Sequence, residues 1–297
     1  MRVMALWNRS LWLVACGVLL FSSSVRASWH HQTLVEPFAL GLSTTASTKF
    51  DSIALNPAIA ALQTSTKVGS STSQLYSYSA SVIALSAVTQ LPYNTVLAVR
   101  TPIKSYTGLP ETEADSNNEA TQTGTFSDVE SEIEITLAKQ LVSQPLYLGL
   151  SIASLHHKIQ SETASGYRIG AGVLYLTPYA NFAATIEQLA YKKLWSTGRN
   201  ESRPKQTHFG IKVPILYSFN VFSDITLQLK ARTQFHTGLE SRIGQHLNLQ
   251  LGMYDTFKQR RFSVGAALNL SDIKLTYALS QHNDLGSTYK MGVQVEL

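Results

Sequence analysis

The chain has 297 residues, of which 44% are hydrophobic and only 14% are charged, and it contains a single cysteine. One cysteine excludes an intrachain disulfide and any metal centre built on a cysteine pair. The formal net charge of +5 is the one compositional feature that could favour an anionic partner such as nucleic acid.

Residues 1–27 have the composition of a secretory signal peptide, with arginines near the start, an apolar run from Leu11 to Phe21 and a small-residue site that ends at Ala27. Cleavage there removes Cys16 and three arginines, so 270 residues remain and the net charge falls from +5 to +2. The charge excess that would favour nucleic acid therefore largely disappears. Two alternatives are a lipoprotein signal that ends at Cys16 and a retained anchor, for which the apolar run is short.

The segment FALGLSTTASTKFDSIALNPAIAAL follows the leader, and its Asn56, Pro57 and Ala58 predict the start of a short apolar helix. Asparagine is a favoured helix N-cap, and proline fits the first turn because its missing N–H would have no partner there. Such a short helix is not stable alone in water, so other parts of the chain must cover it. We assign residues 28–63 to a plug or hatch segment, which serves either as filler or as a gate.

The remainder, residues 64–297, repeatedly alternates apolar and polar residues with a period of two. These runs are eight to ten residues long, which suits a tilted strand that crosses a bilayer, whereas strands of soluble sandwiches usually have five or six residues. We predict an all-β fold, a membrane-spanning antiparallel β-barrel of about 14 strands with the N-terminal plug in its lumen. The predicted strands are 65–77, 79–90, 94–104, 129–142, 145–159, 166–177, 181–191, 206–217, 222–234, 238–246, 247–256, 260–270, 272–281 and 287–297.

Two long connections, Ser105 to Asp128 and Lys192 to Lys205, follow the third and seventh predicted strands, and the even-numbered connections are short. Outer-membrane barrels have long loops outside the cell and tight periplasmic turns, so long connections are expected only after odd-numbered strands when both chain ends are periplasmic. The first loop is acidic and the second is basic. They could hold a divalent ion and lipopolysaccharide phosphates, respectively, or they could simply be solvated.

The C-terminal segment STYKMGVQVEL alternates up to its last residue. An unpaired strand edge within lipid would leave backbone groups without hydrogen-bond partners, so the last strand of a barrel pairs with the first. We therefore expect this strand to close the barrel wall. Its apolar face carries Tyr289, Met291, Val293, Val295 and Leu297.

Two features resemble known families. The alternating C-terminal strand looks like the recognition signal of bacterial outer-membrane barrels, although Leu297 replaces the usual final aromatic residue. The Asn56-Pro57-Ala58 element is similar to the segment that opens FadL-type barrels, the long-chain fatty-acid transporters, and the related PorV-like barrels of secretion systems. The hairpin from Leu275 to Thr288 resembles the closing hairpin of the PorV-like branch. The FadL-type resemblance implies fourteen strands and an N-terminal segment inside the barrel.

Sequence motifs give no support for catalysis. The chain has no Gly-x-Ser-x-Gly element, no phosphate-binding glycine loop and no spaced pair of metal ligands. His156 and His157 are adjacent on a predicted strand, so they point to opposite faces and could not bind one ion. We expect no enzyme activity, no catalytic residues, no cofactor and no metal site.

These observations predict a bacterial outer-membrane protein. The FadL-type resemblance implies passive transport of hydrophobic or small amphipathic molecules. An alternative is a PorV-like structural or secretion-associated barrel that acts as an assembly partner, and a third possibility is a small open porin. Expected partners are outer-membrane lipid and lipopolysaccharide, the barrel-assembly machinery and a hydrophobic small-molecule substrate, but no nucleic acid.

Overall fold

The computed structural model describes residues 33–75, 80–114, 120–141, 144–228, 233–256, 259–282 and 286–297. The predicted signal peptide, residues 1–27, lies outside these ranges. Among the described residues, no helix combines the length and the apolar character that a bilayer-spanning helix requires.

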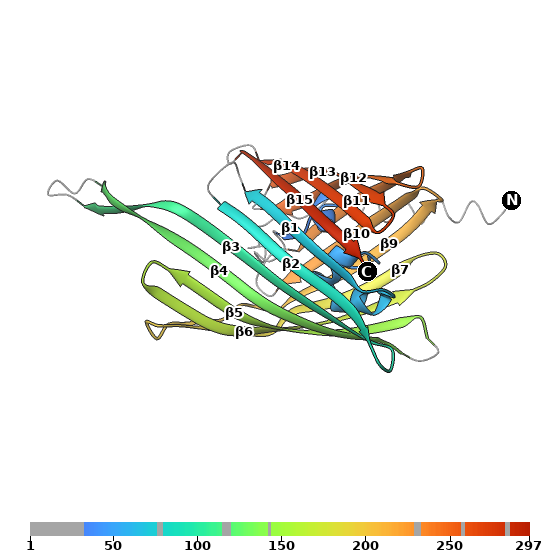
Figure 1. Ribbon diagram of the computed structural model, residues 1–297, viewed down its shortest axis with the longest axis horizontal. Helices are drawn as coiled ribbons and strands as arrows, with labels where there is room; N and C mark the ends of the chain where they lie inside the picture. The colour runs from blue at the N-terminus through green and yellow to red at the C-terminus, as the bar shows by residue number, and fades with distance from the viewer. Residues whose placement is uncertain are drawn as a thin grey trace.

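Antiparallel strands form one continuous ring (Figure 1). Strand β8 has two residues and pairs only with β7, and the other fourteen strands close the barrel, which confirms the predicted all-β antiparallel barrel of about 14 strands. The strands are β1 (Lys67–Leu75), β2 (Ala80–Leu91), β3 (Thr95–Ala114), β4 (Ala120–Gln140), β5 (Leu146–Ile159), β6 (Glu162–Leu176), β7 (Asn181–Trp195), β8 (Asn200–Glu201), β9 (Gln206–Leu216), β10 (Phe219–Gln228), β11 (Gln234–Ile243), β12 (Leu247–Thr256), β13 (Gln259–Leu270), β14 (Ile273–His282) and β15 (Gly286–Glu296).

The ring closes between its first and last strands. The pairing of β1 with β15 runs from Lys67 opposite Glu296 to Gln74 opposite Tyr289. Just beyond β15, the Leu297 N–H donates to the Thr66 carbonyl at 2.9 Å, so hydrogen bonding continues to the last residue of the chain. No strand edge is left open along this seam.

Burial is inverted relative to a soluble protein. Apolar residues at alternate strand positions are exposed on the outer surface, whereas the polar residues between them are buried in the lumen. Exposed apolar residues include Ile83, Leu85, Ile133, Ile135, Leu137, Leu150, Ile152, Leu249, Leu251, Val264, Met291 and Val293. Buried polar residues include Glu130, Glu132, Glu134, Arg168, His208, Asp224, His236, Gln250 and Lys290. This distribution is typical of a barrel whose outer surface contacts hydrocarbon and whose interior is polar.

The barrel is taller on one side than on the other. Strands β3 and β4 have 20 and 21 residues, whereas β9 to β15 have 10 to 12 residues each. In Figure 1, the hairpins of β3 to β6 extend well past the rest of the wall. We call this end the hairpin rim, and the opposite end, where β1 begins and β15 ends, the termini rim.

The tall side corrects one prediction. The predicted loop from Ser105 to Asp128 is mostly strand, because β3 continues to Ala114 and β4 begins at Ala120. The sequence there lacks an apolar face, which is why the alternation suggested a loop. Outside the hydrocarbon layer neither face of a hairpin has to be apolar. Backbone hydrogen bonds between the two strands can therefore extend the hairpin where the sequence shows no alternation of apolar and polar residues.

The boundaries of several other strands also differ from the predictions. Strand β7 continues to Trp195 instead of ending at residue 191, so the loop expected from Lys192 begins four residues later. Strand β10 covers 219–228 instead of 222–234, and β11 covers 234–243 instead of 238–246. Hydrophobic alternation cannot locate a strand end where inward-facing and outward-facing residues are both polar.

Residues 33–63, which we call the N-terminal segment, lie against inward-facing side chains on two walls of the barrel. The segment contains α2 (Glu36–Ala39) and the 3-10 helices η2 (Phe50–Ala54) and η3 (Pro57–Leu62). On one wall, Phe50 and Ala60 pack against Val88, Val96 and Ala138. On the other wall, Val35, Phe38 and Ala39 pack against Tyr254 and Ala278.

A charge placed on the outer apolar face should destabilise the barrel. We expect Ile135→Arg, at the centre of the apolar run of β4, to lower the free energy of unfolding by about 2–4 kcal/mol, because arginine at the bilayer midplane is costly. The matched control is Ser131→Arg on the same outward face near the hairpin rim, with an expected cost of about 0–1 kcal/mol. Denaturant titration of both variants in phospholipid vesicles measures the difference, and equal costs would show that Ile135 does not face hydrocarbon.

Candidate functional site

The Asn56 side chain ties the N-terminal segment to the wall. Its Oδ1 accepts the Ala58 N–H at 3.0 Å, which is the N-cap interaction expected from the sequence. Its Nδ2 donates to the Thr45 carbonyl at 2.9 Å and to the Val173 carbonyl of β6 at 3.2 Å. One fully buried side chain therefore caps η3, connects two parts of the segment and binds the barrel.

Glycines in the wall make room for this contact. Gly149 of β5 and Gly172 of β6 are paired across the two strands. A Cβ on Gly149 would overlap the Pro57 backbone, and a Cβ on Gly172 would overlap the Asn56 side chain. Only glycine permits so close an approach of the segment to the sheet.

A cluster of buried ions fixes α2 to the opposite wall. We call it the segment anchor and define it as Glu36 and Lys49 of the segment with Glu240 of β11, Gln250 of β12 and Lys274 of β14. The Lys49 Nζ lies 2.8 Å from the Glu36 Oε1 and also pairs with Glu240, and Lys274 pairs with the other Glu36 oxygen. Gln250 Nε2 donates to Glu36 at 3.0 Å and to Glu240 at 3.1 Å.

The anchor controls the ionisation of two carboxyl groups in the segment. Burial alone would raise the pKa of Glu36, but the positive charges of Lys274 and Lys49 outweigh it and hold that pKa well below its ordinary value. The pKa of Asp51 shifts the other way, because burial and the negative charge of Glu36 raise it. Asp51 also accepts the N–H groups of Val35 and Glu36, at 3.3 and 3.4 Å.

Two neighbouring cavities separate the segment from the rest of the wall, and we call them together the wall gap. The larger one holds about 440 Å³ of space not filled by atoms, its open mouth included, between the segment and β1 to β4. The smaller one, about 280 Å³, lies between the segment and β14, β15, β1 and β2. Both are lined by Phe50, Asp51, Ser71 and Ser86.

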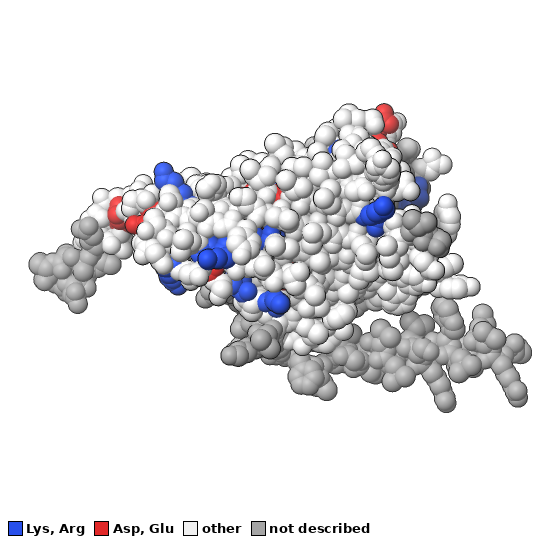
Figure 2. All heavy atoms as spheres, turned by 90° about the horizontal axis from the view of Figure 1, so that it is seen from below, with Lys and Arg blue, Asp and Glu red and all other residues white. Residues whose placement is uncertain are grey.

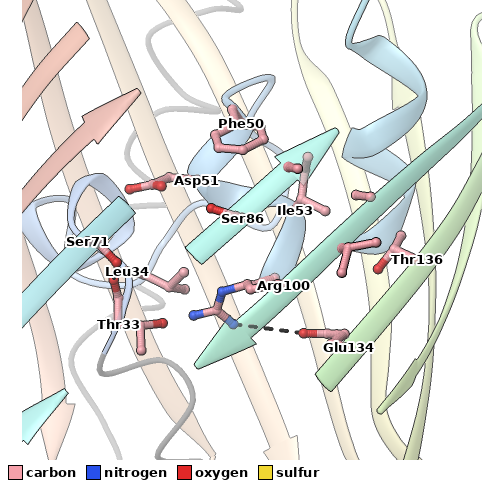
Figure 3. A pocket seen from close by; sticks show the side chains of 14 residues that line it. Thr33, Leu34, Phe50, Asp51, Ile53, Ser71, Ser86, Arg100, Glu134 and Thr136 are labelled. Atoms are coloured by element: carbon pink, nitrogen blue, oxygen red, sulfur yellow. Dashed lines mark hydrogen bonds and ion pairs between the residues drawn. The ribbon is translucent and has the colours of Figure 1, made fainter. Parts of the chain in front are cut away.

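The larger cavity is amphipathic (Figure 3). Leu34, Phe50 and Ile53 approach it from the segment and supply apolar surface. The facing wall offers small residues such as Ser71 and Ser86, and the Arg100 Nη1 and Glu134 Oε2 atoms lie 3.8 Å apart at its edge. A small, mainly apolar molecule is the kind of ligand that fits such a lining.

An ion-pair network lines the lumen on the tall side. Glu130, Glu132 and Glu134 alternate along β4 and face inward. Arg168 of β6 approaches Glu132 at 2.9 Å and Glu134 at 3.5 Å. Glu130 lies 3.2 Å from Lys104, 3.3 Å from Lys193 and 2.9 Å from His157. Cationic side chains from three strands, Lys104, Arg168 and Lys193, therefore pair with one row of carboxylates, and the His157 ring of β5 contacts the same row.

Aromatic rings accompany this network toward the hairpin rim. The His157 and Trp195 rings lie 4.8 Å apart, and the Lys193 Nζ lies 5.4 Å from the centre of the Trp195 ring. Lys104 lies similarly over Tyr106, and Arg203 over Tyr191. His156 is exposed on the outer face while His157 is buried in the lumen, so the two imidazoles face opposite sides of the wall. The tall wall thus has a charged and aromatic inner surface above the wall gap.

The structure brings only some of the sequence-predicted site residues together. Asn56, Pro57 and Ala58 meet β5 and β6, whereas Tyr289, Met291 and Val293 lie on the outer surface of β15, away from the lumen. The sequence analysis missed the segment anchor and the glycines under the segment. Glycine at inward positions of otherwise alternating strands was the one available signal, because it marks close approach of another backbone. Within the described ranges, no cluster of three His, Cys, Asp or Glu residues could hold a metal ion.

Comparisons with solved structures agree with this architecture. The toluene transporter TodX of Pseudomonas putida matches with a TM-score of 0.65 and 12% identity, over 92% of this chain and 98% of that one. A FadL homologue of Pseudomonas aeruginosa matches with a TM-score of 0.58 and 7% identity, over 93% and 99% of the two chains. No protein-family model and no curated protein sequence matches the chain. The chain therefore shares the fold of FadL-type barrels, as the sequence resemblance implied.

Filling the space under Asn56-Pro57-Ala58 should loosen the segment. We expect Gly149→Ala to destabilise the protein by about 1–3 kcal/mol, because the added methyl group meets backbone that cannot move aside. The control is Gly124→Ala on β4, where the nearest atom to a Cβ belongs to the flexible Glu111 carboxylate. Unfolding titration and limited proteolysis of residues 33–63 provide the two measurements. Equal behaviour of the two variants would contradict the close contact at Gly149.

The segment anchor should make retention of the segment pH-dependent. Because the pKa of Glu36 is depressed in the folded protein, its stabilisation is complete above the ordinary value of 4.5 and is lost as the pH falls below that value. We expect residues 33–63 of the folded barrel to become sensitive to an acid-active protease only in this acidic range.

Glu36→Gln should make the segment protease-sensitive already at neutral pH, since removal of one partner from a buried ion pair costs about 3–5 kcal/mol. Glu296→Gln, which removes an exposed pair with Lys67, serves as the control and should change little. Persistent protection of the segment in Glu36→Gln would refute the anchoring role.

Proposed function

We propose that this protein is a passive channel for small hydrophobic or weakly amphipathic molecules in a bacterial outer membrane. The observation that carries the proposal is the wall gap, a space lined largely by apolar and small side chains between the N-terminal segment and the barrel wall. The shared fold supports the proposal, because the neighbours are described as a toluene transporter and a FadL homologue.

The arrangement favours uncharged solutes. An ion that enters a narrow protein-lined space loses hydration, and the lumenal carboxylates Glu132 and Glu130 are already paired with Arg168 and Lys193. A monoaromatic hydrocarbon or similar small molecule has no such hydration to lose. It can move along Leu34, Phe50 and Ile53 by exchanging one apolar contact for another. The same features disfavour an open porin, which needs a wide water-filled lumen.

Within this proposal, residues 33–63 act as the plug, and Asn56, Pro57 and Ala58 fix its end against β5 and β6. The hairpin rim faces the outside of the cell and the termini rim faces the periplasm, because outer-membrane barrels have short periplasmic turns. Export through a cleaved leader and insertion by the barrel-assembly machinery belong to the same proposal. The alternating closing strand β15 supports the insertion step.

Uptake measurements test the channel directly. We expect proteoliposomes or cells that contain the barrel to take up monoaromatic hydrocarbons faster than protein-free controls, with no gain for sugars of similar size. Planar bilayers should show almost no steady ion conductance. Steady open channels would support a porin instead, and an absence of hydrocarbon uptake would refute the proposal.

A variant that fills the wall gap tests the route. Ser86 lines both cavities from β2, so Ser86→Trp should reduce hydrocarbon uptake several-fold while the barrel still folds. The control is Leu85→Trp, one residue away on the exposed outer face, which should leave uptake unchanged. Equal uptake by the two variants would show that the molecule takes another path.

A further inference from the structure

The outer face of the tall side carries a cluster of exposed groups that neither the lumen nor the wall gap explains. Strands β5 to β7 continue past the apolar run that ends near Ile152, and their outward positions there are mainly polar, with Leu194 of β7 as an exposed apolar exception. Seen from below, this side of the molecule shows several Lys and Arg side chains toward the extended hairpins and few acidic ones (Figure 2).

The strand register places these groups next to each other. Tyr167 of β6 lies opposite Ser154 of β5 on one side and Lys192 of β7 on the other. Ser165 and Thr163 follow on the same face of β6, opposite His156 and Lys158 of β5, respectively. We define the outer basic patch as His156, Lys158, Tyr167 and Lys192, all of which are exposed.

Charge on this wall is segregated by side. Across residues 146–195, all described by the structure, no acidic side chain occupies an exposed outward position, because Glu187 is buried and the partly exposed Glu162 lies at an inward-facing position of β6, two residues before buried Ala164. The acidic residues of neighbouring β4 point into the lumen, where they pair with Arg168 and Lys193. In the adjoining loop, Glu201 pairs with Arg203, while Arg199 and Lys205 are exposed. The outer surface thus retains positive charge without carboxylates beside it.

The height of the patch identifies its partner. Ser154 comes two residues after Ile152, so the patch begins roughly 7 Å beyond the apolar run and covers about 13 Å along β5. That is the level of lipid head groups, and on the proposed orientation it is the outer leaflet. Two lysines with hydroxyl groups between them form the donor set that binds phosphate groups.

We propose that the outer basic patch binds the phosphorylated head group of lipopolysaccharide in the outer leaflet. Lys158 and Lys192 contact phosphate oxygens, and the hydroxyl groups of Ser165 and Tyr167 donate additional hydrogen bonds. The proposal depends on the orientation given under the proposed function but not on the channel, because the patch faces away from the lumen. Lipopolysaccharide binding and hydrocarbon uptake can therefore be measured independently, and loss of one does not prevent measurement of the other.

Lipid titration tests this surface. Purified barrel in a zwitterionic detergent is titrated with bisphosphorylated lipid A, and bound lipid is counted by native mass spectrometry. We expect Lys158→Gln combined with Lys192→Gln to weaken binding by about fivefold for each lysine removed, the contribution of one lysine near an anionic membrane surface. Lys139→Gln, an exposed outward lysine at the termini rim, should bind as the wild-type protein does.

Other lipids and a charge-preserving variant show whether the patch recognises the phosphates of lipid A. Dephosphorylated lipid A and phosphatidylglycerol should both bind clearly more weakly than bisphosphorylated lipid A, and Lys158→Arg with Lys192→Arg should retain binding. Hydrocarbon uptake by the double Gln variant should remain unchanged. Undiminished lipid A binding by that variant, or equal binding of phosphatidylglycerol by the wild-type protein, would overturn the proposal.

Discussion

The absence of water from a hydrocarbon layer is the constraint on which this structure depends. Each backbone N–H and C=O in the wall needs a partner within the wall, so the sheet must close on itself. The pairing of β1 with β15 provides that closure, between residues more than two hundred positions apart in the chain. The same constraint puts apolar side chains outside and leaves the polar ones to face each other across the lumen.

The filling of the lumen follows from this inversion. Polar side chains that cannot point outward need partners inside, and the N-terminal segment supplies many of them. Lys49 and Glu36 engage Glu240 and Lys274, and the Asp224 carboxylate accepts the Thr45 N–H at 2.9 Å. On the tall side, the carboxylates of β4 pair with cations of other strands, Arg168 of β6 and Lys193 of β7, instead. The wall gap lies where the wall presents small residues such as Gly69, Ser71 and Ser86 to the segment.

The strands that contact hydrocarbon are well predicted from the sequence. There, outward-facing side chains must be apolar and inward-facing ones can be polar, so the alternation is clear. The run from Leu247 to Met253 lies on β12 within its predicted bounds. The extension of β3 and β4 was missed because residues 105–114 and 120–128 are held by cross-strand backbone pairing, which leaves no hydrophobic signature. The capping role of Asn56 is local and could be read from the sequence. Gln250 and Lys274, the wall partners of Glu36, lie more than two hundred residues away, and no local pattern encodes such a contact.

The short link between the N-terminal segment and the wall has a mechanical consequence. Helix η3 ends at Leu62 and β1 starts at Lys67, so the four intervening residues reach at most about 14 Å when fully extended. The C-terminal end of the segment is thus covalently tethered to the barrel, whereas the described contacts of α2 with the wall include ion pairs and hydrogen bonds from wall side chains. The tether limits how far η3 can move away from β1, and it sets no such limit on α2.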